Sequence, residues 1–235
     1  MNGCSTKDDD SFVRKVFQTN GASEVREHTF KLQKSIVKYY EKLNKRNPNH
    51  SSKLNTKKII NDINKRIDTV SFDVFTKKKN ITYKEYLNVA FSKSYVKNRN
   101  DYLIAGIYKM LYFAYAIDRS HTITTMQYDI EKIQEANKMM QIIQYRIQTD
   151  KNKDGDFLFL TWQRPWQIDL LKNINKKKEI DLEKYTKKDL MYHSNMSFQV
   201  ITTGMIFTLQ ETLRYLGSES TNLSSEAIKS VFVFL

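Results

Sequence analysis

The spacing of apolar residues along the chain predicts several long amphipathic helices. Apolar residues recur every three or four positions over residues 24–46, 126–149 and 195–216, which places them on one face of an α-helix. Residues 102–119 are apolar nearly all round, as is typical of a central helix. We expect the core to be built on helices 102–119, 126–149 and 195–216. The predicted apolar faces are Val25, Leu32, Ile36, Tyr40 and Leu43; Ile133, Ala136, Met140, Ile143 and Ile147; and Phe198, Ile201, Met205, Leu209 and Leu213.

Residues with strong positional preferences indicate where the first helices begin and end. Asn20-Gly21 predicts a break before the helix that starts near residue 24, and Asn47-Pro48-Asn49 predicts its end. Thr56 is the expected N-cap of a second helix. Thr82 and Glu85 have the spacing of a capping box, so a further helix should begin there.

The later helix ends follow from the same preferences. The helix after Thr82 is expected to run to about Lys97, and Asn100 or Asp101 to cap the next one. Gly106 costs about 1 kcal/mol relative to alanine within that helix, and the close approach of another helix would offset this cost. Gly217 stands where a glycine often ends a helix.

Two short segments predict strands. Residues 70–75 alternate apolar and polar side chains, and residues 157–160 form an apolar run, so the two segments could pair as a minor ribbon. Glycine (6) and proline (2) are too scarce for a turn-rich β fold. The sequence therefore predicts a mainly α fold, a single bundle-like domain of several helices with at most one small β-ribbon. Residues 1–20 are expected to be a flexible tether and residues 21–235 the helical domain.

Positive charge is concentrated in one part of that domain. The whole chain carries a net charge of +13, and residues 31–100 hold 18 basic and 5 acidic residues, which is also +13 (18 − 5). The domain thus has a basic part, 31–100, and a neutral core part, 101–235. The basic part predicts contact with phosphates of nucleic acid or anionic lipid, or else an ordinary solvated face. Its candidate contact residues are Lys77, Lys78 and Lys79.

Two loops carry the other candidate binding residues. Trp162, Arg164 and Trp166 have the composition of a protein-binding hot spot. Asp150, Asn152 and Asp154 resemble the first half of an EF-hand calcium loop, but Thr161 stands where a bidentate glutamate is needed. A polar Asp-Gly turn is the favoured interpretation, with weak calcium binding at most.

The remaining candidates favour structural roles. Four tyrosines crowd the central helix, where they either line a groove or, as is more common, fill the core: Tyr102, Tyr108, Tyr112 and Tyr115. The histidines lack the spacing of metal ligands: His28, His50, His121 and His193. The sequence contains no motif typical of nucleophilic catalysis or nucleotide binding. We therefore expect no enzymatic activity, no cofactor and no resident metal.

The N-terminus carries the strongest indication of function. Cys4 is the only cysteine, and it follows the small residue Gly3 and precedes a polar run. This pattern resembles the processing site of a bacterial lipoprotein, although Met1 stands where such sites usually have leucine, and an upstream export segment is required. The resemblance implies a lipid anchor on Cys4 and, with Ser5 next to it, delivery to the periplasmic face of the outer membrane.

These observations predict a lipid-anchored protein of the cell envelope that acts as a non-enzymatic binding or scaffolding component. Its partners would be the membrane surface, through the anchor and the basic region, and another envelope protein. The alternative is a cytoplasmic basic protein that binds nucleic acid through residues 31–100.

Overall fold

The structure is a computed structural model and describes residues 7–66, 82–117, 128–164, 166–169, 193–219 and 222–223. The predicted mainly α fold is confirmed. The helices are α1 (Lys7–Arg46), the short 3₁₀ helix η1 (Pro48–His50), α2 (Lys53–Asn64), α3 (Tyr83–Ala90), α4 (Arg99–Ala114), α5 (Ile130–Thr149) and α7 (His193–Tyr215). The predicted strand at residues 70–75 lies outside the described residues.

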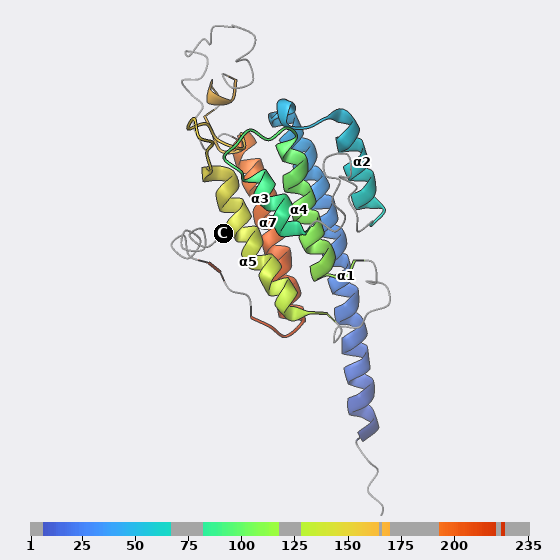
Figure 1. The fold of residues 1–235 in the computed structure, drawn as a ribbon. Coiled ribbons are helices and arrows are strands. Elements are labelled where there is room, and N and C mark those ends of the chain that lie inside the picture. The colour runs from blue at the N-terminus through green and yellow to red at the C-terminus, as the bar shows by residue number, and fades with distance from the viewer. Residues whose placement is uncertain are drawn as a thin grey trace, which may run out of the picture.

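The long helices α1, α4, α5 and α7 form a bundle, and the shorter helices α2 and α3 lie on its outside (Figure 1). α7 packs against α1 and α5, α4 packs against α1 and α5, α3 covers α4, and α2 lies against α1 and α4. α1 and α7 run antiparallel, because Lys42 bonds to Ser197 while His28 lies 2.9 Å from the Thr212 hydroxyl. The N-terminal part of α1 projects past the end of the bundle (Figure 1).

The predicted break at Asn20-Gly21 is wrong, because α1 is one continuous helix of 40 residues from Lys7. A single glycine within a helix costs only about 1 kcal/mol. Ala22 and Val25, just after the predicted break, are buried. Residues 7–20 therefore belong to the same helix as the residues that follow them.

The predicted apolar faces are confirmed, because all fifteen of their side chains are buried. α4 is buried at every position except Lys109 and Phe113. The four tyrosines of this part of the chain belong to the core rather than to a groove, since each is at most 9% exposed: Tyr102, Tyr108, Tyr112 and Tyr115. The Tyr115 hydroxyl donates to that of Thr212 at 2.8 Å, which joins the end of α4 to α7.

Several helix ends agree with the sequence and others do not. The capping box is confirmed: the Thr82 hydroxyl accepts from the Glu85 amide at 3.3 Å, and the Glu85 carboxylate accepts from the Thr82 amide at 2.7 Å. At Gly217 the backbone φ is +75°. The amides of Gly217 and Ser218 donate back to the carbonyls of Arg214 and Leu213, which completes a Schellman motif.

Helix α3 ends at Ala90 instead of Lys97, and the reason is the buried Arg99. Its guanidinium donates to the carbonyls of Ala90 (2.6 Å), Ser92 (2.8 Å) and Ser94 (2.8 Å). Because these carbonyls all point toward one cation, they do not accept the backbone hydrogen bonds that would continue the helix. α4 then begins at Arg99 with Asn98 as N-cap, so the predicted caps Asn100 and Asp101 are wrong.

Two other local predictions are also wrong. Ser52, and not Thr56, caps α2, because its hydroxyl accepts from the Asn55 amide at 3.1 Å. Thr56 instead donates to the Ser52 carbonyl at 2.9 Å. Residues 157–160 do not form a strand: Phe157 makes an isolated bridge to Lys151, and the next residues bend inward, where Leu158, Phe159 and Leu160 are buried.

The predicted close approach at Gly106 is confirmed. A Cβ atom at this position would lie 2.7 Å from Leu87 Cδ2 and 3.3 Å from the Leu87 backbone nitrogen. Both distances are too short for an unstrained contact, so α3 can pack this closely on α4 only because residue 106 lacks a side chain.

We predict that Gly106→Ala lowers the free energy of unfolding by about 1–3 kcal/mol, because overpacking outweighs the better helix propensity of alanine. Chemical denaturation of this variant, of Leu87→Ala and of the double variant would give the coupling energy. The double variant should be more stable than the sum of the single changes predicts. Additive effects would show that the two positions do not compete for space.

Candidate functional site

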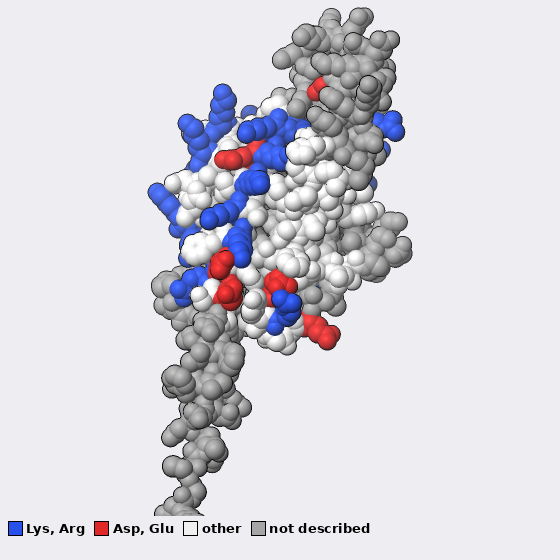
Figure 2. Space-filling view, turned by 180° about the vertical axis from the view of Figure 1, so that it is seen from behind, with Lys and Arg blue, Asp and Glu red and all other residues white. Residues whose placement is uncertain are grey.

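The candidate site is a lysine-rich surface formed by α1 and α2, here called the basic face. On α1 the lysines recur at helical spacing, so they form one stripe: Lys31, Lys34, Lys38, Lys42 and Lys45. On α2 they are Lys53, Lys57 and Lys58. All are exposed except Lys42, which is half-buried. Figure 2 shows these positive side chains gathered along one side of the molecule, with few acidic ones among them.

The basic face carries an excess of positive charge, although Lys31 at its edge is paired with Glu27 at 2.8 Å. Residues 31–66 contain nine lysines and two arginines, against Glu41 and Asp62. The pKa of Lys42 is lowered, first by partial burial and then by repulsion from the neighbouring cations Arg46, Lys38 and Lys45. An anion placed over the patch would relieve this repulsion.

Arg46 has a structural role beside this patch. It is buried and bonds to Ser194 and to the Asn195 amide oxygen, at 3.1 Å for the latter. Its guanidinium also lies 5.3 Å from the ring centroid of Phe198. Arg46 therefore fixes the end of α1 against α7, while the exposed lysines of the basic face remain accessible to a ligand.

An open hollow of about 380 Å³ lies where α1, η1 and α2 meet. Lys45, Lys53 and Lys57 stand around it, together with polar residues and one proline: Asn44, Pro48, Ser51, Ser52 and Thr56. The N-terminus of α2 begins at its wall, where the helix dipole adds positive potential. The hollow thus joins the lysines of α1 to those of α2 in one continuous basic surface.

A buried carboxylate holds the wall of this hollow in place. Asp101 of α4 is fully buried; one of its oxygens accepts from the Tyr40 hydroxyl at 2.6 Å and the other from the Asn55 amide at 3.0 Å. Burial raises the pKa of Asp101, and the hydrogen bonds from Tyr40 and Asn55 only partly oppose this shift. Asp101 therefore links α1, α2 and α4, although burial disfavours the charged form of its side chain.

The tryptophan-containing segment lies near the C-terminal end of α1. Trp162 and Trp166 are half-buried and Arg164 is exposed. The Asn195 amide donates to the Gln163 carbonyl at 2.8 Å, and Asn195 in turn accepts from Arg46. Trp162 also lines a small cavity beside Phe198. The structure thus gives Trp162 a packing contact and leaves Arg164 as the most exposed of the three candidate partner-binding residues.

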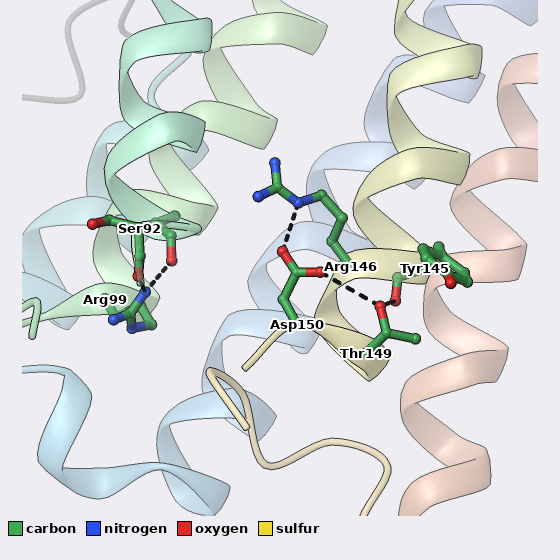
Figure 3. A network of polar contacts seen from close by, with 7 residues as sticks. Ser92, Arg99, Tyr145, Arg146, Thr149 and Asp150 are labelled. Atoms are coloured by element: carbon green, nitrogen blue, oxygen red, sulfur yellow. Dashed lines mark hydrogen bonds and ion pairs between the residues drawn. The ribbon is translucent and has the colours of Figure 1, made fainter. Parts of the chain in front are cut away.

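The Asp150–Asp156 segment is built as a polar turn. Asp150 pairs with Arg146 at 2.8 Å (Figure 3). The Asn152 amide oxygen accepts from the backbone amides of Asp154 (2.9 Å) and Asp156 (2.8 Å), and Gly155 has φ +87°. Two of the oxygens needed for calcium are therefore already engaged, that of Asp150 by Arg146 of α5 and that of Asn152 within the turn. Among the described residues, no group of three or more His, Cys, Asp or Glu side chains could hold a metal ion.

Several candidate residues from the sequence lie outside the described part of the chain, and the lysine stripe on α1 was not predicted. Cys4, His121 and Lys77, Lys78 and Lys79 lie outside the described residues. The basic segment was predicted from the sequence but the lysine stripe on α1 was not, although the spacing of its lysines indicates one helix face. Within the described part of the chain, no helix is both long and apolar enough to span a membrane.

Comparison of the chain with protein-family models, curated proteins and solved structures found no match in any of the three.

We predict that Asp101→Asn changes how stability depends on pH. Because the folded-state pKa of Asp101 is raised above its ordinary 3.8, the folded protein binds a proton more tightly than the unfolded chain. This contribution to stability is full below the ordinary pKa and is lost as pH rises through the folded pKa. Urea unfolding across the acidic range should show the stability of the variant, relative to the native protein, increasing with pH. A difference that is constant with pH would refute the raised pKa.

Proposed function

We propose that this chain is a lipid-anchored binding protein of the cell envelope, and that the basic face lies against the anionic surface of the membrane that holds the anchor. The observation that carries the proposal is the basic face, a continuous set of exposed lysines on α1 and α2. The anchor would be an acyl group on Cys4, in keeping with the lipoprotein-like N-terminus. Binding or scaffolding of another envelope protein would fall to other surfaces, for which the Arg164 segment is the candidate.

The type and arrangement of the cations support a membrane surface over nucleic acid. Lysine is a point charge without the two-pronged geometry with which arginine grips phosphates or reads bases. Lysines spread over two helices suit a surface of diffuse negative charge, where each one contributes about 1 kcal/mol. The hollow beside Ser51 and Ser52 would accommodate a headgroup at the same surface.

The length of α1 sets the orientation of the domain in this proposal. A helix of 40 residues is about 60 Å long. Its N-terminal end lies near Cys4 in the sequence, while its lysine stripe lies in the other half. The anchor at Cys4 and the lysine stripe can reach the same membrane only if α1 lies parallel to the membrane surface rather than perpendicular to it. A lipid anchor together with a basic patch is a common pairing for such attachment.

We predict that the triple variant Lys53→Gln, Lys57→Gln and Lys58→Gln binds anionic vesicles more weakly than the native protein. At about 1 kcal/mol per lysine, the loss should be about 3 kcal/mol, or roughly a hundredfold in affinity. Vesicles of phosphatidylglycerol and phosphatidylcholine, tested by co-sedimentation at several salt concentrations, would measure it. Binding by the native protein should weaken as salt rises.

The matched control removes the same charge from other elements, through Lys93→Gln, Lys138→Gln and Lys153→Gln, all exposed in the native protein. This control should keep most of the affinity. Equal losses in both triples would contradict a specific basic face. Salt-sensitive binding to duplex DNA, with none to anionic vesicles, would favour the nucleic-acid alternative. Mass spectrometry of the protein from its own host would separately test the anchor, since an unmodified Cys4 would contradict it.

A further inference from the structure

The hollow where α1, η1 and α2 meet brings three lysines together from two helices. Lys45 lies in the last turn of α1, and Lys53 and Lys57 lie in the first two turns of α2. The volume of the hollow, about 380 Å³, is near the lower end of the range for small-molecule pockets. The hollow therefore has the size for one small anionic group, and it is a defined point within the basic face of Figure 2.

Within the described part of the chain, no carboxylate is paired with these three lysines. The residues that line the hollow include no aspartate or glutamate, and none of the ion pairs of the described residues involves Lys45, Lys53 or Lys57. Glu41 lies one helical turn before Lys45 but forms no ion pair with it. Asp101, behind the wall, is fully buried. The hollow therefore favours an anion, and a doubly charged anion more than a singly charged one.

The wall of the hollow offers a hydrogen-bond donor and a carbon surface as well as charge. The Ser52 hydroxyl accepts from the Asn55 amide at 3.1 Å, and no hydrogen bond of the described residues uses its own hydrogen. Most of the exposed lining is carbon, as the Pro48 ring and the stems of three lysines would provide. An inorganic anion would use only the charges, whereas the organic part of a phosphate ester would also cover the carbon surface.

Leu54 favours a lipid as the source of such a phosphate ester. It precedes Lys57 and Lys58 by three and four residues, so it lies beside them on α2. Its side chain is 78% exposed. A leucine among lysines suits the boundary between headgroups and acyl chains, where the apolar side chain is buried while the cations meet the phosphates.

We propose that this hollow binds the phosphomonoester headgroup of an anionic lipid, with Lys45, Lys53 and Lys57 around the phosphate and Leu54 at the boundary with the acyl chains. The proposal deepens the proposed function and rests on it, because it requires the basic face to meet the membrane. A phosphomonoester carries a charge of about −1.5 to −2 at pH 7, whereas the phosphodiester of phosphatidylglycerol is singly charged. The hollow thus adds a preference for one headgroup class to the diffuse attraction of the other lysines.

The first test measures selectivity between headgroups. Phosphatidylcholine vesicles that contain phosphatidic acid or phosphatidylglycerol, matched in surface potential, are compared by co-sedimentation. The native protein should bind the phosphatidic acid vesicles at least about tenfold more tightly, as one added hydrogen bond between charged groups would give. Lys45→Gln with Lys57→Gln should abolish this preference. Circular dichroism would show that the variants keep their helices.

The matched control, Lys34→Gln with Lys58→Gln, removes the same charge from exposed positions of the basic face that do not line the hollow. It should weaken binding to both kinds of vesicle and keep the preference. Equal binding of the native protein to both kinds would overturn the headgroup site and leave the proposed function standing, whereas binding to neither would overturn both. A preference that the two double variants lose equally would also overturn the site.

The second test separates a lipid from a soluble phosphate ester, with glycerol 3-phosphate as the soluble probe in calorimetry. The probe should bind roughly a hundredfold more weakly than the phosphatidic acid vesicles, because Leu54 and the other lysines of the basic face then contribute nothing. Leu54→Ser should weaken binding to the vesicles and leave binding of the probe unchanged. Val200→Ser, at an exposed apolar position of α7, should change neither. A probe that binds as tightly as the vesicles, with no effect of Leu54→Ser on either, would overturn the lipid and assign the hollow to a soluble phosphate ester.

Discussion

Burial of α4 on nearly every side is the constraint on which the arrangement of the other helices depends. A helix that exposes only Phe113 and part of Lys109 must be surrounded, and α1, α2, α3 and α5 all contact it. Hydrophobic burial alone is non-directional and would allow these helices to slide. Their register is instead set at points where only one alignment fits, such as Leu87 over Gly106 and the Tyr40 hydroxyl on Asp101.

The position of the basic face depends on the same buried contacts. α2 has only 12 residues and packs against the bundle through a few side chains. Asn55 donates to Asp101, and Asn44 of α1 donates to the Thr56 hydroxyl at 3.0 Å, so polar bonds fix α2 beside the end of α1. These hydrogen bonds, made by buried and half-buried polar groups, therefore hold the exposed lysines of the two helices on one side despite their mutual repulsion.

The sequence was sufficient for features that depend on local periodicity. The apolar faces of α1, α5 and α7, the capping box at Thr82 and the glycine contact at Gly106 follow from residue spacing or from the cost of one residue. Predictions of helix ends failed where a side chain beyond the helix decides the end, as Arg99 does by binding the carbonyls at the end of α3. The hollow and its support could not be predicted, because Tyr40 and Asp101 are 61 positions apart and no pattern in either segment indicates the other.

The Thr212 hydroxyl lies where α7 meets α1 and the end of α4. Its hydrogen bonds determine which ring nitrogen of His28 carries a proton. It donates its only hydrogen to the Thr208 carbonyl at 2.8 Å and accepts from the Tyr115 hydroxyl. The contact with His28 Nδ1 at 2.9 Å can then be a hydrogen bond only if that nitrogen carries the hydrogen. Neutral His28 is therefore held in its Nδ1–H tautomer, with the lone pair on Nε2. A threonine that is fully buried thus selects the tautomer of an imidazole 184 positions away in the chain.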